Sequence, residues 1–432
     1  MAQKKFIDAS SPADMSTLNL NLRHLQAFAA VAATGSVTRA GEVLFRVASA
    51  ITRAIAELEH SLGTPLFERK SRGMLRNTFG DAVLARTQRI ESEFTLACAE
   101  LTGSEPGPAA GKSRLEARTL QAALFNGRRL AVFASLAEME NMPAAARAYG
   151  ITQPAISTLV RELEALCGRQ LFVRSPRGVT PTRAGTALAF RFKRVLAELR
   201  SIDSDIAAIA GLVQGSVIVG ALPLGRTLLL PSAIAALVSR HPGLHVSTVE
   251  SPYEVLAAAL RSGAVDFILG ALRPDDDTPD LVQDTLFNDR LSLVVRAGHP
   301  LTKAGSVKAD DLARAQWVLS RPGTPLRELL EKSLSHRQLP SPVPRVETAD
   351  LAILRGLLLQ SDMVTAISAH QLHYEIAAGT LVVLDFPLPL TQRRIGMAQR
   401  RGALPSAGVR ALMDQIHALT PGMQALGDGP AA

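Results

Sequence analysis

The sequence predicts a multidomain protein in which two all-α winged helix-turn-helix domains precede an α/β domain. Three observations support this prediction. A segment around residue 150 has the spacing of a helix-turn-helix, and the same pattern occurs 105 residues earlier. Strands alternate with helices only after residue 215. The 432 residues are enough for two or more domains with sizeable cores.

The clearest helix-turn-helix pattern lies within residues 144–164. An alanine-rich helix is followed by Gly150, which supplies the turn. Thr152 is a suitable N-cap for the second helix, and Pro154 in its first turn loses no needed hydrogen bond. Apolar residues at helical spacing predict the buried face of this helix, namely Ile156, Val160 and Leu163.

Another face of the same helix presents polar side chains at intervals of four residues, Gln153, Ser157 and Arg161. In a DNA major groove, Gln makes paired hydrogen bonds to adenine and Ser bonds to any base. An ordinary amphipathic surface helix is the alternative for this segment taken alone. Downstream, Arg174 and Arg177 flank a glycine turn and suit a wing that contacts phosphates.

Together these residues resemble the LysR-type transcriptional regulators. The Thr-Gln-Pro-Ala-Ile-Ser run, the Leu-Phe-x-Arg step and an Arg-Gly wing followed by Thr-x-x-Gly are similar to that family's DNA-binding signature. Several elements at fixed mutual spacing are more specific than any single one. The resemblance implies these DNA-binding residues in the second copy: Thr152, Gln153, Pro154, Ser157, Thr158, Arg161, Arg174 and Arg177.

An earlier copy of the pattern begins at Leu25, which matches Leu130 at the offset of 105. Further matches at that offset pair Phe28, Ala40, Ile51, Leu58, Leu66, Phe67, Arg69, Gly73 and Gly80 with Phe133, Ala145, Ile156, Leu163, Leu171, Phe172, Arg174, Gly178 and Gly185. The chain therefore carries two tandem units where the family usually has one.

The two copies differ at the positions where DNA would be read. Ala48 stands in the place of Gln153 and cannot make its paired hydrogen bonds, although Arg53 could contact phosphate or guanine. We expect both copies to contact DNA and the second to read bases better. The alternative is a first copy kept for dimerisation or backbone contact. The candidate contacts of the first copy are Ser49, Thr52, Arg53, Arg69, Lys70 and Arg72.

The net charge of +8 is concentrated in the half that carries both copies. Residues 1–210 hold 27 Lys and Arg against 19 Asp and Glu, whereas the remainder holds 20 of each. A basic half is the expected electrostatic footprint of binding to double-stranded DNA. A solvated basic surface is the alternative.

Long helical patterns follow each wing, at about residues 78–101 and 182–212. Their apolar spacing suits a helix that pairs with a partner helix, and the resemblance implies dimerisation. Packing within the chain is the alternative. The expected divisions are a disordered arm 1–18, a first winged helix-turn-helix with its helix 19–101, a linker 102–113, a second winged helix-turn-helix 114–185, a dimerisation or linker helix 186–212, an effector-binding domain 213–420 and a tail 421–432.

The last half alternates strands and helices, which predicts an α/β domain with largely parallel sheets. The expected strands are 217–220, 246–250, 267–270 and 291–295. This half resembles the effector-binding domain of LysR-type regulators, in the branch that includes galactose-binding-protein and protocatechuate-pathway regulators. The resemblance implies a two-lobed, periplasmic-binding-protein-like fold, with lobe I at 213–288 and 388–420 and lobe II at 289–387.

Two strand-to-helix turns, 222–227 and 321–327, are the best candidates for binding a small-molecule effector. Each opens a helix whose free N–H groups attract an anion, and in a two-lobed fold the turns would face each other across a cleft. Plain turns with surface arginines are the alternative. The candidate residues are Pro223, Leu224, Gly225, Arg226, Ser251, Arg321, Thr324 and Ser368. A sugar or an aromatic acid is the expected effector, and no other cofactor is expected.

Enzymatic chemistry has little support, because no Gly-rich phosphate loop, nucleophile elbow or Cys/His pair occurs. His370 and His373 lack a third metal ligand, and the distant Cys98 and Cys167 argue against a zinc site or a disulfide. No signal peptide or membrane span is evident, so we expect a cytoplasmic protein.

These patterns predict a sequence-specific transcriptional regulator that forms a homodimer or homotetramer and is modulated by a metabolite. A contact with RNA polymerase is a further expectation. The alternative is a cytoplasmic ligand sensor or solute-binding protein that uses its helix-turn-helix units only for assembly.

Overall fold

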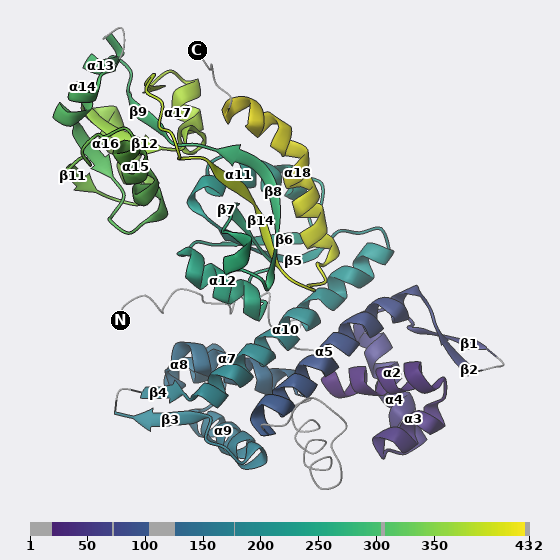
Figure 1. The fold of residues 1–432 in the computed structure, drawn as a ribbon. Coiled ribbons are helices and arrows are strands. Elements are labelled where there is room, and N and C mark those ends of the chain that lie inside the picture. The colour runs from purple at the N-terminus through teal and green to yellow at the C-terminus, as the bar shows by residue number, and fades with distance from the viewer. Residues whose placement is uncertain (1–19, 71–72, 103–125, 177, 304–306, 428–432) are drawn as a thin grey trace.

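The structure is a computed structural model that describes residues 20–70, 73–102, 126–176, 178–303 and 307–427. Two winged helix-turn-helix units lie on one side of the molecule and a two-lobed α/β domain lies on the other (Figure 1). This architecture confirms the predicted fold class. The expected arm at 1–18 and nearly all of the expected linker at 102–113 lie outside the described residues, as do the last residues of the expected tail.

The first unit (residues 20–102) and the second unit (residues 126–209) have the same order of elements. The first consists of α2 (Leu22–Thr34), α3 (Val37–Leu44), α4 (Ala48–Leu62), β1 (Phe67–Lys70), β2 (Gly73–Arg76) and α5 (Thr78–Thr102). The second consists of α7 (Gly127–Met139), α8 (Met142–Ala148), α9 (Gln153–Cys167), β3 (Phe172–Ser175), β4 (Gly178–Pro181) and α10 (Arg183–Ile209).

The repeat extends to individual hydrogen bonds. The carboxylate of Glu59 accepts from the backbone N–H of Leu66 at 2.7 Å, and Glu164 accepts from Leu171 at 2.8 Å. Each bond ties the second helix of a helix-turn-helix, α4 or α9, to the start of its wing. The donor and the acceptor of the second bond lie 105 residues after those of the first. The repeat in sequence is therefore also a repeat in structure.

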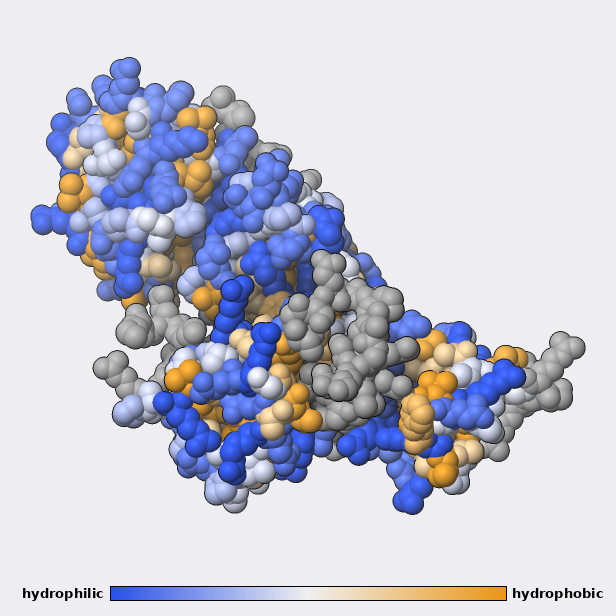
Figure 2. All heavy atoms as spheres, turned by 60° about the horizontal axis from the view of Figure 1, so that its bottom comes forward, coloured by the Kyte–Doolittle hydropathy of each residue, from blue (hydrophilic) through white to orange (hydrophobic). Residues whose placement is uncertain are grey.

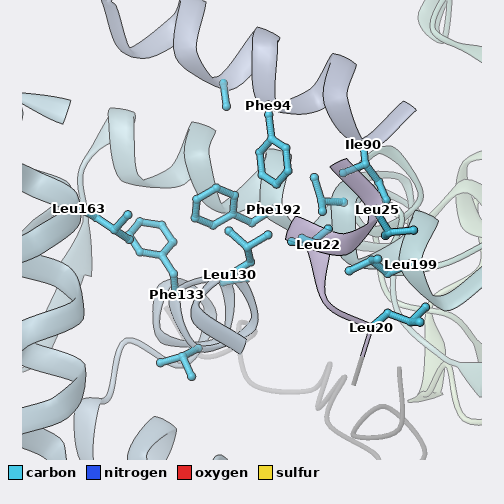
Figure 3. Packing of buried hydrophobic residues seen from close by; sticks show 14 of the residues in the cluster. Leu20, Leu22, Leu25, Ile90, Phe94, Leu130, Phe133, Leu163, Phe192 and Leu199 are labelled. Carbon is cyan, nitrogen blue, oxygen red and sulfur yellow. The ribbon is translucent and has the colours of Figure 1, made fainter. Parts of the chain in front are cut away.

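The equivalent helices α5 and α10 pack along each other and join the two units (Figure 1). A single hydrophobic core runs through both units. Figure 3 shows Phe94 of α5 and Phe192 of α10 within it, between Leu22 of the first unit and Phe133 of the second. The packing within the chain that stood as an alternative for these long helices is therefore what the structure has.

Lobe I is built on one five-stranded sheet of order β6-β5-β7-β14-β8. Its elements are β5 (Gly215–Ala221), η1 (Pro223–Arg226), α11 (Leu229–Val238), β6 (Leu244–Val249), α12 (Tyr253–Ser262), β7 (Phe267–Ala271), η2 (Asp275–Asp277), β8 (Leu281–Asp289), β14 (Arg393–Arg400) and α18 (Ala407–Gly427). Helix α11 packs against α18 and the two share the core of this lobe.

Lobe II is built on a second five-stranded sheet, of order β11-β10-β12-β9-β13. Its elements are β9 (Ser292–Arg296), α13 (Pro300–Lys303), α14 (Ala309–Arg314), β10 (Gln316–Leu319), α15 (Pro325–His336), β11 (Pro344–Glu347), α16 (Leu351–Gln360), β12 (Met363–Ile367), η3 (Ala369–Leu372), α17 (His373–Ala377) and β13 (Leu381–Val383).

The expectation of largely parallel sheets is wrong for half of the strand pairs. In lobe I, β5 pairs in parallel with β6 and β7, but β14 pairs antiparallel with β7 and β8. Lobe II repeats this mixture around β9. The reason is that the chain crosses between the lobes twice, and the strand that follows each crossing enters a sheet against the direction of its neighbours.

The α/β domain rests on the paired long helices through lobe I. Arg200 of α10 contacts both the carbonyl of Gly263 at 3.2 Å and the carboxylate of Asp266 at 3.3 Å. Arg86 of α5 donates to the carbonyl of Leu404 at 2.8 Å. The helices that join the two units therefore also carry the α/β domain. In the described part of the chain, no helix has the length and apolar character needed to cross a membrane.

Candidate nucleic-acid interface and ligand cleft

Helix α9 begins and ends as its sequence dictates. The hydroxyl of Thr152 accepts from the backbone N–H of Ala155 at 3.4 Å and caps the helix, and Gly168 ends it in the left-handed region at φ 61°. The predicted apolar face is buried in the core of the second unit. The opposite edge, including Gln153 and Arg161, is exposed to solvent.

The second unit couples its reading helix to its wing. Arg174 of β3 donates to the hydroxyl of Ser157 at 2.6 Å, and Arg161 donates to the hydroxyl of Thr158 at 3.3 Å. An open groove of about 500 Å³ lies between α9 and the wing and includes both arginines and Ser157 in its lining. Arginines beside a helix edge with hydroxyl and amide groups provide phosphate contacts and base contacts on one surface. Arg177 lies outside the described residues.

The reading helix of the first unit presents a different chemistry. Val47 occupies the N-cap position of α4 without a side-chain cap, and Ala48 and Ser49 are exposed. Thr52 is exposed and donates to the carbonyl of Ala48 at 3.1 Å. Arg53 is 82% exposed and pairs with Glu57 at 2.7 Å, which reduces its availability for phosphate. The side chains of Arg69 and Lys70, and the whole of Arg72, lie outside the described residues.

Apolar side chains are exposed at the turn that leads into α4. Val43, Phe45 and Val47 are 54%, 80% and 69% exposed. Figure 2 shows apolar side chains gathered on this unit, at the lower right. The positions equivalent to Phe45 and Val47 in the second unit are Gly150 and Thr152, so the apolar surface belongs to the first unit alone.

The first predicted effector turn is η1, at the end of β5. Leu224 and Gly225 are buried, whereas Pro223 is exposed. Arg226 is half-buried, its Nε donates to the carbonyl of Ala221 at 2.8 Å, and burial lowers its pKa below the ordinary value. The charge of Glu250 partly offsets this effect of burial, but among the described residues the Arg226 guanidinium forms no ion pair, so it is a partly desolvated cation that no carboxylate contacts.

The second predicted turn opens α15. The hydroxyl of Thr324 donates to the carbonyl of Arg321 at 2.8 Å and does not cap the helix, and Arg321 is exposed. The sequence predicts that this turn faces η1, but no contact between the two among the described residues supports that prediction. The lobes instead meet between η1 and η3, where Thr227 donates to the carbonyl of Gln371 at 3.2 Å. Ser251 is half-buried ahead of α12.

Ser368, the last of the candidate effector residues, lies where the chain crosses between the lobes. It is fully buried, and its hydroxyl donates to Asp289 at 2.6 Å. Asp289 also accepts from Arg393 at 2.9 Å and lies 3.2 Å from Nδ1 of His370, whose Nε2 lies 3.0 Å from the carbonyl of Met423. The burial arises because the end of β12 meets the ends of β8 and β14 where the chain crosses between the lobes.

The hinge network is charged despite its burial. Burial alone would raise the pKa of Asp289, but the hydrogen bond from His370 and the charge of Arg393 hold it below its ordinary value. Burial would lower the pKa of His370, but its bonds to Asp289 and the Met423 carbonyl raise it. His370 is therefore a buried member of an ionic network, and no cluster of three metal-ligating side chains occurs among the described residues.

A second buried ionic cluster, which joins the two units, was not predicted from the sequence. Arg86 pairs with Glu198 at 2.8 Å and with Asp205 at 2.7 Å, and Arg89 pairs with the same Glu198 at 2.7 Å. These residues are separated by more than 100 positions along the chain. In the sequence, these residues stand out only as polar positions on otherwise apolar helix faces. That pattern does not predict which residue pairs with which.

Comparisons with known proteins agree with this geometry. The family of bacterial regulatory helix-turn-helix proteins, lysR family, matches residues 22–81 and again 127–186. The LysR substrate binding domain matches residues 210–420. The HTH-type transcriptional regulator GalR of Pseudomonas putida is 47% identical over 399 residues, which cover 92% of this chain and 96% of that one. This alignment omits fewer residues than one unit contains, so that relative matches across both units.

Other relatives match less of the chain. The HTH-type transcriptional regulator PcaQ of Agrobacterium fabrum is 27% identical, and the match covers 67% of this chain and 93% of PcaQ. A full-length OxyR variant from Pseudomonas aeruginosa superimposes with a TM-score of 0.50 at 24% identity, covering 67% of this chain and 97% of that one. Such coverage is what a protein with one helix-turn-helix unit and one effector domain would give, and the likeness to the OxyR structure concerns the fold alone.

Proposed function

The chain belongs to the lysR family of bacterial transcriptional regulators, and from that premise we propose which of its residues carry DNA recognition and effector binding. Helix α9 and its wing bind DNA through the exposed residues Gln153, Thr158 and Arg161, together with Ser157 and Arg174. Helix α4 binds through Ser49, Thr52 and Arg53. Thr152 and Pro154 set the start of α9, and thereby the direction in which Gln153 points.

The observation that supports this proposal is the free edge of α9. Gln153, Thr158 and Arg161 are exposed while the apolar face of the helix packs in the core, and Ser157 beside them is bonded to Arg174 of the wing. An edge with an amide, a hydroxyl and two arginines matches the donor and acceptor pattern of a major groove and its phosphates.

A selection experiment tests base reading. The full-length protein is used to enrich a motif from a pool of random duplexes, and the variant Gln153→Ala is compared with the wild type on that motif. We expect the variant to lose about 1–3 kcal/mol of discrimination against the wrong base while it keeps its affinity for random DNA. Unchanged discrimination would count against base reading by α9. Absence of salt-dependent DNA affinity would favour the alternative of a ligand sensor.

For the effector, we propose a small molecule that carries a carboxylate. Arg226 supplies a half-buried cation without an ion-pair partner among the described residues, and the uncapped start of α15 supplies free N–H groups. An aromatic acid provides the required anion, whereas a neutral sugar would use hydrogen bonds from Thr324 and Ser251. Binding between the lobes would shift how lobe I sits on α5 and α10, and so couple the two sites.

A thermal-shift panel of aromatic acids and sugars distinguishes these effectors. A true effector raises the melting temperature increasingly as its concentration exceeds its dissociation constant. The variant Arg226→Ala should lose the shift produced by an acid, and Arg240→Ala, an exposed arginine in the same lobe, is the matched control. A shift that survives in Arg226→Ala would remove that residue from the site. We also propose that the protein forms a homo-oligomer and that it contacts RNA polymerase.

A further inference from the structure

The two DNA-binding units of one chain are paired through equivalent helices. Helices α5 and α10 begin at Thr78 and Arg183, which are related by the same offset of 105 as the rest of the repeat. In a two-fold symmetric dimer, each surface meets its own copy on the partner. The packing of α5 on α10 reproduces that relationship inside a single chain.

The contacts between these helices are specific as well as apolar. Arg191 of α10 bonds to Glu93 at 3.0 Å and also to Glu100, while Arg194 pairs with Glu93 at 2.7 Å. The side chain of Glu93 is 9% exposed, so these pairs lie within the interface rather than at its edge. Together with the shared core in Figure 3, these ion pairs hold the two units against each other.

The two reading helices of this body differ in chemistry. Helix α9 starts with Gln153, which suits hydrogen bonding to adenine. Helix α4 has Ala48 at the equivalent position, preceded by the exposed Val47. Small apolar side chains in a major groove contact the methyl group of thymine, which no other base of DNA carries.

We propose that one chain is the covalent equivalent of a dimer and binds two half-sites of unlike sequence. Helix α9 reads its half-site through hydrogen bonds, and α4 reads the other through apolar contact of Val47 and Ala48 with thymine methyl groups. This inference rests on the proposed DNA-binding function and specifies how that function is divided between the units. The partner is double-stranded DNA, and the determinant on the α4 side is the 5-methyl group.

The first test uses the duplex that the full-length protein selects from a random pool. Thymines are replaced one at a time by uracil, which keeps every hydrogen bond and removes only the methyl group. We expect a three- to fivefold loss of affinity, at about 0.8 kcal/mol per buried methyl, for thymines in one half-site only. We expect Gln153→Ala to relax base preference in the opposite half-site. Equal effects on both half-sites would overturn the inference.

The second test asks whether both units must belong to the same chain. Gln153→Ala removes the adenine contact of α9, and Ala48→Asp places a carboxylate in α4 among the phosphates. Each variant must keep the wild-type melting temperature, and Ala48→Val serves as the apolar control for the second. We expect that co-expressed Gln153→Ala and Ala48→Asp chains bind the duplex no better than either variant alone. Restored wild-type affinity would show that units from separate chains combine, and would overturn the inference.

Failure of the inference can be told apart from failure of the proposed function. If the protein enriches no motif from the random pool, both the proposed function and the inference are wrong. Suppose instead that the motif has two identical half-sites and that Gln153→Ala lowers the base preference in both. The proposed function then stands, and only the pairing of two units within one chain is excluded. Insertion of about five base pairs between unlike half-sites turns one to the other side of the duplex, and should weaken binding by about tenfold or more.

Discussion

Arg86 of α5 and Glu198 of α10 form an ion pair of 2.8 Å between side chains that are 2% and 7% exposed. Asp205 bonds to the same guanidinium, and the carbonyl of Leu404 accepts a further bond from it. One arginine of the first unit is therefore held by two carboxylates of the second unit and by the effector domain. The three parts of the chain meet at this side chain.

Replacement of Arg86 by Ala should destabilise the full chain by about 3–5 kcal/mol, because the largely buried Asp205 would lose its partner and the buried Glu198 would keep only its pairing with Arg89 and the longer contact with Arg400. Chemical denaturation followed by circular dichroism measures the change. Arg314→Ala is the control, since that side chain is 73% exposed in its pair with Asp311 and should cost no more than about 1 kcal/mol. Equal effects of the two substitutions would mean that the buried cluster does not hold the units together.

The His370–Asp289 pair predicts a pH-dependent stability. The pKa of His370 is raised above 6.5, so its charged pairing stabilises fully below that pH and is lost as the pH rises through the raised pKa. The pKa of Asp289 is held below 3.8, so its contribution is lost only as the pH falls through that lower value. The stabilisation by His370 over His370→Gln should therefore be largest at about pH 5 and shrink towards about pH 8.

Melting temperatures of the wild type and of His370→Gln across that pH range measure this difference. His336→Gln, at an exposed histidine of α15, is the control and should show no such trend. A gap between wild type and His370→Gln that grows with pH would contradict the assigned direction of the His370 pKa.

The glycines after each wing allow a close approach of backbone that no other residue permits. A Cβ on Gly185 would lie 2.0 Å from the carbonyl oxygen of Leu171, and one on the equivalent Gly80 would lie 2.3 Å from that of Leu66. Gly185→Ala must therefore displace the wing or the start of α10, and we expect a loss of more than about 2 kcal/mol in thermal unfolding. Gly356→Ala in α16, whose Cβ would meet nothing closer than 3.8 Å, should instead be neutral or stabilising by up to about 1 kcal/mol.

Arg174 should contribute to DNA affinity without contributing to sequence choice. Its guanidinium lies on the wing beside Ser157, where it can reach a phosphate. Arg174→Ala should weaken binding to the selected and the random duplex alike, and lower the slope of log affinity against log salt by about 1. Fluorescence anisotropy at several salt concentrations measures both. Lys332→Ala, on the exposed surface of lobe II, is the matched loss of charge and should leave the slope unchanged.

Local patterns were enough to predict the elements of both units. The cap at Thr152, the apolar face of α9 and the glycine turns depend on residues within a few positions of one another, and the offset of 105 repeats them. The expected strands of lobe I coincide with β5, β6 and β7 for the same reason. The family resemblance added the two-lobed fold, which the LysR substrate binding domain match supports.

The sequence by itself thus determined that two helix-turn-helix units and an α/β domain follow one another, because periodicity and caps are properties of short segments. Only the tertiary structure decided that α5 pairs with α10 of the same chain, that Ser368 is buried against Asp289, and that both sheets are mixed. Each of these depends on contacts between residues far apart in the chain. The free energy of such contacts depends on shared burial and charge pairing, which a linear pattern does not specify.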